Sequence, residues 1–258
     1  MRIAAFDFDG TILFGDDIPA DTITAIRAWQ DAGHLAVAAT GKSRSAAQFA
    51  LRGFDVAFDY SVLFTGAVVT DRNDTVLHST ALDVELVRSI VAELSDTPGL
   101  AVYGTTLESN DARFLSTLPP TMSTSILRDF REVAVHEVTG EQFIGVPIWV
   151  PEDRELRLRI HDWVQQNFDV DVFLNQTFID ILPRGASKGT GLQWLIEHLG
   201  VSRDDVELIT FGDSWNDLSM HAIADRSYSF SWSPDDVKAD THATIDTVAE
   251  GLLTHLNH

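Results

Sequence analysis

The sequence predicts an α/β protein whose parallel-sheet core is built from both ends of the chain and is interrupted by an inserted α+β domain. Short apolar runs alternate with helical patterns over the first part of the chain, and the same rhythm returns after Pro183. Strand–helix–strand repetition at this spacing is typical of a parallel sheet. The stretch between these parts is irregular and rich in strand patterns. We therefore expect residues 1–80 and 184–258 to form the core and residues 81–183 to form the inserted domain.

The first part of the chain contains three predicted buried strands with helices between them. A strand that is buried on both faces is a continuous apolar run, and the first strand has this character apart from Asp7. The first helix begins at a proline and is closed by Gly33. In chain order we expect strand Ile3–Phe8, helix Pro19–Ala32, strand Leu35–Ala39, helix Ser45–Leu51 and strand Ser61–Phe64.

The middle of the chain changes character after Thr65. Two short strands flank a polar turn and predict a hairpin, and the later pair Asn175-Gln176 joins two further strands. The segment Pro119–Ser125 is expected to be a loop, and Asp169-Val170-Asp171 is interpreted as a solvated strand edge. The predicted elements are strands Ala67–Thr70 and Thr75–His78, helices Leu82–Leu94 and Glu152–Phe168, and strands Val170–Leu174 and Phe178–Leu182.

The last part of the chain returns to alternating strands and helices. A helix that ends at Gly200 is followed by a buried apolar run, as in the first part. The predicted elements are helix Ser187–Leu199, strand Val206–Phe211, helix Asp217–Ala224, strand Ser227–Ser231 and helix Val248–Leu256.

The composition excludes several classes of function. The 258 residues carry a formal net charge of −21, which disfavours nucleic acid and membrane surfaces as partners. There is no cysteine, so disulfides, thiolate catalysis and zinc–thiolate sites are excluded. The amino terminus reaches Asp7 too early for the apolar core of a signal peptide, and no apolar run approaches the length of a membrane span. We therefore expect a cytoplasmic protein.

Two carboxylates follow the first predicted strand in Asp7-Phe8-Asp9-Gly10-Thr11. A turn at Gly10 would let Asp9 move away from the face on which Asp7 lies. The carboxyl end of a central strand is where open α/β sheets bind ligands. One aspartate could therefore act as a nucleophile and the other could transfer a proton. The alternative is a chance pattern in a chain rich in aspartate.

Thr40-Gly41-Lys42-Ser43 lies between the second predicted strand and a helix. A threonine hydroxyl, a glycine and a helix amino terminus together favour the binding of an anion. A simple helix cap at Ser43 explains the same residues equally well. A nucleotide-binding P-loop is excluded because Ala36 stands where such a loop requires its first glycine.

Two further motifs occur in the last part of the chain. Lys188 opens a helix, where its charge is poorly matched to the helix dipole, and holding a phosphoryl group against a carboxylate would explain it. A solvent-facing lysine is the alternative. Gly212-Asp213-Ser214-Trp215-Asn216-Asp217 follows a predicted strand and offers the oxygen ligands that Mg²⁺ prefers, with a capped helix start as its alternative.

The four motifs, in this order, resemble those of the haloacid dehalogenase-like (HAD) superfamily of phosphatases. The long insertion resembles the large cap of the type IIB members, the Cof-like sugar phosphatases. Residues 178–195 are similar to that group's entry into its third motif. The chain departs from the group's pattern at Thr65-Gly66-Ala67, where Asn-Gly-Ala is usual, and at Lys42, where an arginine is usual. It also lacks the common Asn-Ala pair near Phe230-Ser231-Trp232.

The resemblance implies a Rossmann-like core and a reaction through an aspartyl-phosphate. Asp7 would attack phosphorus, and Asp9 would protonate the leaving alcohol and then activate water. Lys188 would act with them and would bind the phosphoryl oxygens together with Thr40 and the amide of Gly41. The implied Mg²⁺ ligands are the side chain of Asp7, the carbonyl of Asp9 and the side chain of Asp213. Around these would lie residues that orient them, namely Thr11, Asn216 and Asp217.

The sequence therefore leads to a Mg²⁺-dependent phosphatase that hydrolyses small phosphorylated metabolites, with sugar phosphates as the favoured class. The same residues would serve a phosphotransferase or phosphomutase, in which an alcohol replaces water as the acceptor. A catalytically idle binding protein of the same fold is the alternative from another class. Neither nucleic acid nor membrane is expected as a partner.

Overall fold

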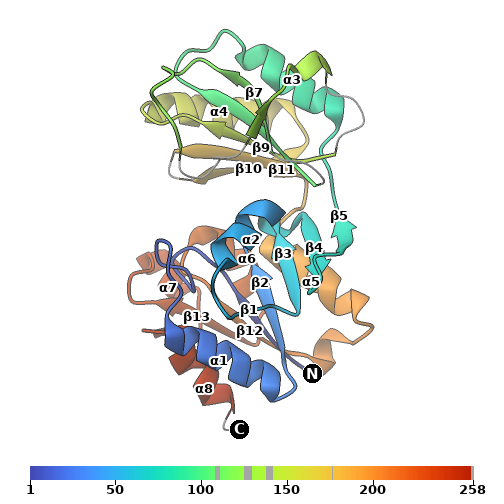
Figure 1. The fold of residues 1–258 in the computed structure, drawn as a ribbon, viewed down its shortest axis with the longest axis vertical. Coiled ribbons are helices and arrows are strands. Elements are labelled where there is room, and N and C mark those ends of the chain that lie inside the picture. Colours follow the sequence, from blue (N-terminus) through green and yellow to red (C-terminus); the bar gives the residue numbers. More distant parts are fainter. Residues whose placement is uncertain (108–110, 125–129, 138–141, 176, 257–258) are drawn as a thin grey trace. The chain divides into compact units, whose positions relative to one another are not determined.

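The computed structural model describes residues 1–107, 111–124, 130–137, 142–175 and 177–256. The chain divides into two compact units, which we call the core unit (Met1–Ser79 with Ser187–His258) and the inserted unit (Thr80–Ala186). Within the described residues the core unit contains an eight-stranded sheet and the inserted unit a six-stranded sheet (Figure 1). The predicted fold class, α/β with a parallel sheet, is confirmed.

The sheet of the core unit is parallel through its centre. Its strand order is β14-β13-β12-β1-β2-β3-β4-β5, and neighbouring strands from β14 to β3 run parallel, whereas β4 and β5 are added antiparallel as a hairpin. The strands are β1 (Arg2–Phe6), β2 (Leu35–Ala39), β3 (Tyr60–Leu63), β4 (Val68–Asp71), β5 (Val76–Ser79), β12 (Glu207–Phe211), β13 (Arg226–Phe230) and β14 (Ala243–Ile245).

Helices cover both faces of this sheet. Ile3 and Ala5 of β1 belong to one apolar cluster with Leu192 and Leu195 of α5 and with Met220 of α6. Because side chains alternate along a strand, the intervening residues of β1 face the other side, where α1 and α8 pack together (Figure 1). The helices are α1 (Ala20–Asp31), α2 (Arg44–Leu51), α5 (Lys188–His198), α6 (Leu218–His221), α7 (Asp235–Ala239) and α8 (Val248–Leu256), with 3₁₀ turns at Phe64–Gly66, Arg203–Asp205 and Trp215–Asp217.

In its described residues the inserted unit is an antiparallel-rich sheet with two helices. Its strand order is β10-β11-β9-β6-β7-β8, and Val102, Ile148 and Ile179 of the sheet share one apolar cluster with Ile90 of α3 and Ile160 of α4. Its elements are α3 (Val84–Leu94), β6 (Ala101–Thr106), β7 (Asp111–Ser116), β8 (Phe130–Glu132), a 3₁₀ turn (Val135–Glu137), β9 (Phe143–Trp149), α4 (Arg154–Asn167), β10 (Val170–Asn175) and β11 (Phe178–Pro183).

Three details differ from the sequence-based expectation. The first strand ends at Phe6 rather than Phe8, because the carbonyl of Phe8 accepts hydrogen bonds from the amides of Thr11, Ile12 and Leu13 and so closes a turn. The predicted helix Asp217–Ala224 is a 3₁₀ turn followed by the short α6. Helix α7 and strand β14 were not predicted. No helix in the described part of the chain is long and apolar enough to cross a membrane.

Candidate active site

Three of the predicted motifs follow neighbouring strands in the middle of the core-unit sheet. β1 lies between β12 and β2, with Phe6 paired to Phe211 on one side and to Ala38 on the other. The amide of Asp7 donates to the carbonyl of Phe211 over 2.9 Å, which aligns the ends of these two strands. Because the strands are parallel, the residues that follow them meet at one edge of the sheet, the usual ligand-binding edge of such folds.

The remaining motif, at the start of α5, contributes Lys188 to this edge, and the side chain of Lys188 is fully buried. Its ammonium nitrogen Nζ donates to Oδ1 of Asp7 over 2.5 Å and to Oδ1 of Asp217 over 2.6 Å. Burial opposes a charged lysine, but the carboxylates of Asp217 and Asp7 raise the pKa of Lys188 above its ordinary value. A buried charge of this kind is tolerated only when it is paired and hydrogen-bonded, and here two acids perform that task.

The helix that carries Lys188 is held close to the sheet by two glycines. Ser187 caps α5 through a hydrogen bond from the amide of Thr190 to its side chain. Gly66 has a φ of +104°, and a Cβ built on it would lie 1.8 Å from the carbonyl oxygen of Ser187. A Cβ on Gly189 would lie 2.3 Å from the carbonyl oxygen of Ser219. Only glycine at these positions allows the amino terminus of α5 to place Lys188 beside Asp7.

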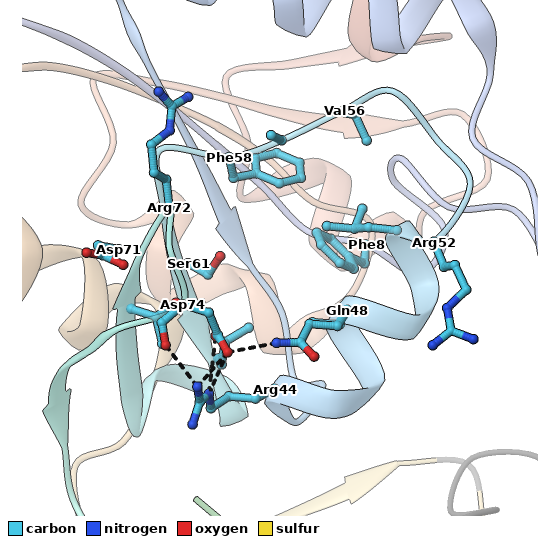
Figure 2. A pocket seen from close by; sticks show the side chains of 15 residues that line it. Phe8, Arg44, Gln48, Arg52, Val56, Phe58, Ser61, Asp71, Arg72 and Asp74 are labelled. Atoms are coloured by element: carbon cyan, nitrogen blue, oxygen red, sulfur yellow. Dashed lines mark hydrogen bonds and ion pairs between the residues drawn. The ribbon is translucent and has the colours of Figure 1, made fainter. Parts of the chain in front are cut away.

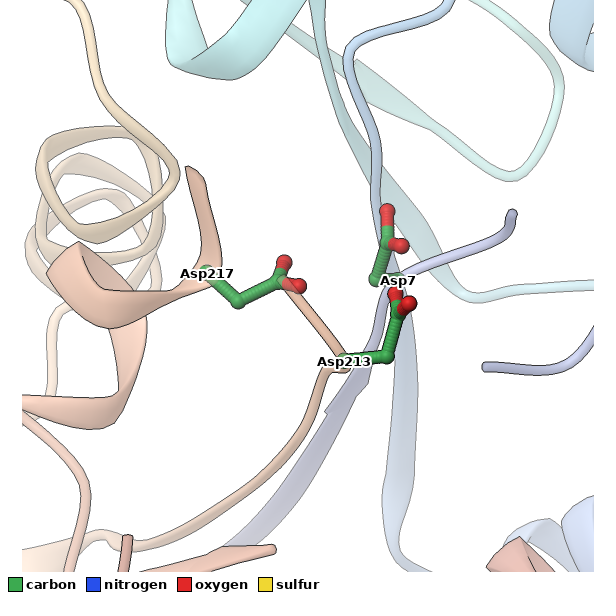
Figure 3. Close-up of side chains that lie close together, drawn as sticks. All are labelled: Asp7, Asp213 and Asp217. Carbon is green, nitrogen blue, oxygen red and sulfur yellow. The ribbon is translucent and has the colours of Figure 1, made fainter. Parts of the chain in front are cut away.

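Three carboxylates gather around this lysine. Each of Asp7, Asp213 and Asp217 offers an oxygen atom, and these atoms all lie within 4.8 Å of one another (Figure 3). Asp217 is fully buried, and its Oδ2 accepts from the amide of Ser214 over 3.0 Å while its Oδ1 accepts from Lys188. Both of its oxygen atoms are therefore engaged, so Asp217 is suited to orient Lys188 and the loop that contains Asp213.

The remaining oxygen atoms fit a divalent cation. Oδ1 of Asp213 and Oδ1 of Asn216 are buried, and neither has a hydrogen-bond partner among the residues that the structure describes. A buried polar atom without a partner is costly, and an ion with oxygen ligands satisfies such atoms. Burial raises the pKa of Asp7 to about 7, an effect that Lys188 opposes and Asp217 reinforces. Burial and the neighbouring Asp217 raise the pKa of Asp213 to about 6. A bound Mg²⁺ would favour the charged form of both aspartates.

Asp9 lies apart from this buried cluster. Its side chain is 66% exposed, and its Oδ2 pairs with Nζ of Lys42 over 2.7 Å. The sequence did not predict this ion pair, because Lys42 stands out there only as part of the Thr40-Gly41-Lys42-Ser43 segment and as a departure from the usual arginine. An exposed carboxylate beside a buried one is the arrangement that allows two acids to have different roles.

The other predicted residues surround these groups. Thr40 is buried, and its hydroxyl oxygen accepts from the amide of Lys42 over 3.2 Å. A Cβ on Gly41 would lie 3.3 Å from the hydroxyl oxygen of Thr65, which is closer than most Cβ contacts, so the backbone of Gly41 packs tightly against Thr65. Thr11 is buried, and its hydroxyl oxygen has no hydrogen-bond partner within the described part of the chain. Gly10 has a φ of +82°, and a Cβ there would lie 2.5 Å from Oδ2 of Asp213, so the turn after Asp9 packs directly against that acid.

A separate hollow lies on the same unit, between α2 and strands β3 and β4 (Figure 2). Its volume is about 440 Å³, and Phe8 and Phe58 form part of its wall. Arg44 and Asp74, which also line it, form an ion pair of 2.5 Å. The three clustered carboxylates do not line this hollow, so it is distinct from the candidate active site.

Comparison with known proteins identifies the family. The model of the haloacid dehalogenase-like hydrolases matches residues 4–255, so the chain belongs to that family. It is 27% identical over 235 residues to an HMP-PP phosphatase of Enterobacter sp. (strain 638), covering 85% of this chain and 80% of that protein. It is 26% identical over 261 residues to a phosphoglycolate phosphatase of Nitrosopumilus maritimus (strain SCM1), covering 99% of this chain and 95% of that protein.

Solved structures support the same fold. A haloacid dehalogenase-like hydrolase from B. subtilis superimposes with a TM-score of 0.83 at 19% identity, covering 100% of this chain and 99% of that one. A HAD subclass IIB sugar phosphatase superimposes with a TM-score of 0.80 at 20% identity, covering 99% of each chain. The resemblance predicted from the four motifs is confirmed, and with it the class of enzyme, a phosphatase of this family.

Proposed function

We propose that this protein is a Mg²⁺-dependent phosphatase that hydrolyses small phosphorylated metabolites, with sugar phosphates as the favoured class, through an aspartyl-phosphate. The observation that carries the proposal is the buried Lys188, whose ammonium group joins Asp7 to Asp217 beside the partnerless oxygen of Asp213. A nucleophilic carboxylate, a fixed cation and oxygen ligands for a metal are the parts that phosphoryl transfer requires.

In the proposed reaction Asp7 attacks phosphorus, and the bond between phosphorus and the leaving oxygen breaks. Lys188 holds Oδ1 of Asp7, which leaves Oδ2 as the attacking atom. Asp9 gives a proton to the leaving oxygen, which departs as an alcohol. Water then attacks the phosphorus of the aspartyl-phosphate while Asp9 takes a proton from this water. The bond between phosphorus and the oxygen of Asp7 breaks, so inorganic phosphate leaves and the carboxylate of Asp7 is restored. The exposed position of Asp9 supports this role, because its carboxyl group must exchange protons in each half of the cycle.

The phosphoryl group is proposed to lie against Thr40, the amide of Gly41 and Lys188, which offer a hydroxyl, a backbone N–H and an ammonium group as donors. The proposed Mg²⁺ ligands are the side chains of Asp7 and Asp213 and the carbonyl of Asp9, and the ion would supply charge neutralisation at phosphorus and keep Asp7 ionised. Thr11, Asn216 and Asp217 are proposed to orient these groups, a function consistent with their partnerless or shared oxygen atoms.

The substrate class rests on the family resemblance and on relatives that are named for small phosphate esters. We also propose that the inserted unit is a cap that limits the size of the substrate. Release of inorganic phosphate from a panel of metabolite phosphate esters, with and without Mg²⁺, tests both. The proposal predicts Mg²⁺-dependent turnover of a hexose phosphate and little turnover of a folded phosphoprotein.

Two variants separate the roles of the aspartates. Asp7→Asn should abolish turnover and prevent any phosphoryl adduct after acid quenching, as read by peptide mass spectrometry. Asp9→Asn should still form the adduct from an activated aryl phosphate but should release phosphate slowly, because water lacks its base. A phosphoryl adduct on another residue, or any adduct in the Asp7→Asn variant, would contradict the mechanism. Formation of a newly phosphorylated alcohol in place of inorganic phosphate would favour the phosphotransferase alternative.

A further inference from the structure

An exposed tryptophan lies beside the catalytic turn. Trp232 follows β13, and its side chain is 47% exposed although it is large and apolar. Its ring stacks on the buried Phe230 at a centroid distance of 4.8 Å and an interplanar angle of 8°. Phe14, which is 42% exposed, meets the same indole edge-on at 5.4 Å. The indole therefore has a fixed orientation, although much of its surface faces water.

The backbone around Trp232 is fixed as well. The amide of Phe230 donates to the hydroxyl oxygen of Ser233 over 3.0 Å, and the amide of Ser233 donates back to the carbonyl of Phe230 over 2.9 Å. These two hydrogen bonds close a tight turn around Trp232. Its ring nitrogen is thus a donor held in place before any substrate arrives.

The ring N–H of Trp232 donates to the turn at Gly10, which links the proposed acid–base Asp9 to the proposed metal ligand Asp213. Nε1 of Trp232 donates to the carbonyl oxygen of Gly10 over 2.9 Å, across 222 positions of sequence. Gly10 directly follows Asp9, and its α-carbon packs so closely on Asp213 that a Cβ would lie 2.5 Å from Oδ2 of that residue. A shift of the Gly10 peptide would therefore move both the proposed acid–base and a proposed metal ligand.

We propose that Trp232 is a positioning residue, which fixes the peptide of Gly10 and thereby the direction in which Asp9 presents its carboxyl group to the leaving oxygen. This inference rests on the proposed function, in which Asp9 protonates the leaving group. In this proposal Trp232 acts through the peptide of Gly10 and not on the reacting atoms. A catalytic acid must lie within hydrogen-bond reach of the atom that it protonates, so a small displacement of its turn reduces the rate of that step.

The test is the Trp232→Phe variant, which keeps an aromatic ring for stacking on Phe230 and Phe14 but removes the N–H donor. Turnover of an alkyl phosphate, whose leaving group needs a proton, is compared with turnover of p-nitrophenyl phosphate, whose leaving group does not. We expect kcat/KM, which reports formation of the phosphoenzyme, to fall about fivefold to tenfold for the alkyl ester and less than about twofold for the aryl ester. The later hydrolysis of the phosphoenzyme, which also uses Asp9, is common to both esters and does not enter these values.

Trp194→Phe is the matched control, because it removes an indole nitrogen from a tryptophan that stacks on His78 and His198 in the same unit. We expect it to leave the ratio of the kcat/KM values for the alkyl and aryl esters unchanged. Thermal denaturation of each variant establishes that it is folded. The ratio of the two rates is the deciding quantity because partial unfolding lowers both rates equally.

Each outcome bears on the inference. An altered ratio in Trp232→Phe, with an unaltered one in Trp194→Phe, supports it. An unchanged ratio in both variants overturns it, whether or not the absolute rates fall, and leaves the proposed phosphatase function in place if the unmodified protein still shows Mg²⁺-dependent turnover. Absence of turnover in the unmodified protein would instead refute the proposed function and this inference together.

Discussion

Replacing Asp213 by asparagine should stabilise the protein when no metal is present. Burial, with Asp217 beside it, raises the pKa of Asp213 from its ordinary 3.8 to about 6. In the folded state the ionised carboxylate is therefore disfavoured relative to the unfolded chain. Asparagine has nearly the same shape but no charge. The variant consequently removes this cost and should have the larger free energy of unfolding above pH 6.

The size of the effect follows from the pKa shift. A rise from 3.8 to about 6 corresponds to an upper limit of about 3 kcal/mol at about 1.4 kcal/mol for each pKa unit. Because the side chain is partly exposed, solvent screening reduces the expected effect to about 1–2 kcal/mol. For a chain of this size that difference raises Tm by about 2–8 °C.

The effect of Asp213→Asn on stability should also depend on pH in a defined direction. A folded-state pKa that is raised contributes stability that is fully present below pH 3.8 and is lost as the pH rises through about 6. The Tm advantage of Asp213→Asn should therefore be about half as large at pH 5 as at pH 8, by calorimetry in the presence of EDTA. Adding Mg²⁺ should stabilise the unmodified protein more than the variant, because the variant lacks a proposed ligand.

Asp204→Asn is the control for this experiment, since it removes the same charge from an exposed residue. We expect it to change stability by less than about 0.5 kcal/mol at either pH. The reasoning is refuted if Asp213→Asn is less stable than the unmodified protein at pH 8 in EDTA, or if its Tm advantage is the same at pH 5.

Three further substitutions test the packing and charge of the site. Lys188→Met leaves the carboxylates of Asp7 and Asp217 buried without their cation and should cost about 3–5 kcal/mol of stability at neutral pH. Gly66→Ala drives a methyl group into the backbone of α5 at a positive φ and should cost roughly 3 kcal/mol, as read by denaturation. Lys42→Met should weaken substrate binding and raise KM about tenfold or less, because one cation beside the proposed phosphate site is lost.

Each of these has a matched control in the same unit. Lys238→Met removes a lysine paired with the exposed Asp235 and should change stability by less than about 0.5 kcal/mol. Gly33→Ala has a comparable φ of +85° with nothing near its Cβ, so it should cost only about 1–2 kcal/mol. Lys42→Arg keeps the charge and should preserve KM. Equal effects in a substitution and its control would contradict the corresponding explanation.

The sequence predicted the elements whose pattern is long or continuous. The central strands were recognised because they are buried on both faces and therefore continuously apolar, as in Leu35–Ala39. Helix α7 (Asp235–Ala239) escaped prediction because five residues, three of them charged, provide no helical period. Strand β14 (Ala243–Ile245) is three residues long, which is too short for an alternating pattern.

Some residues of the candidate active site could likewise be predicted from the sequence, and others could not. The spacing of motifs after parallel strands brought Asp7 and Asp213 to one edge, and the position of Lys188 at a helix start, where the dipole disfavours it, marked that residue as unusual. The pair Asp9–Lys42 and the hydrogen bond from Trp232 to the turn after Asp9 gave no sequence signal. Both depend on side-chain directions in turns, which no hydrophobic period encodes.

The charge of the cluster predicts an order of binding. Three carboxylates and one ammonium group leave the fully ionised centre with two negative charges, inside a protein of formal charge −21. A phosphate ion, itself negative, is therefore repelled until a divalent cation is bound. Isothermal titration of inorganic phosphate, the expected product, should show binding in Mg²⁺ and at least about tenfold weaker binding in EDTA.

The same titration on the Lys188→Met variant distinguishes the contribution of the lysine to phosphate binding from that of Mg²⁺. If Lys188 acts on the phosphoryl group, phosphate affinity in Mg²⁺ should fall about tenfold or more, since a buried charge-assisted hydrogen bond is lost. The variant needs to be folded for this measurement, and circular dichroism in Mg²⁺ establishes whether it is. Phosphate affinity in the unmodified protein that is the same with Mg²⁺ and with EDTA would contradict the charge argument. In that case the lysine alone would be sufficient to overcome the acids around it, and the cluster would have a role other than holding a metal.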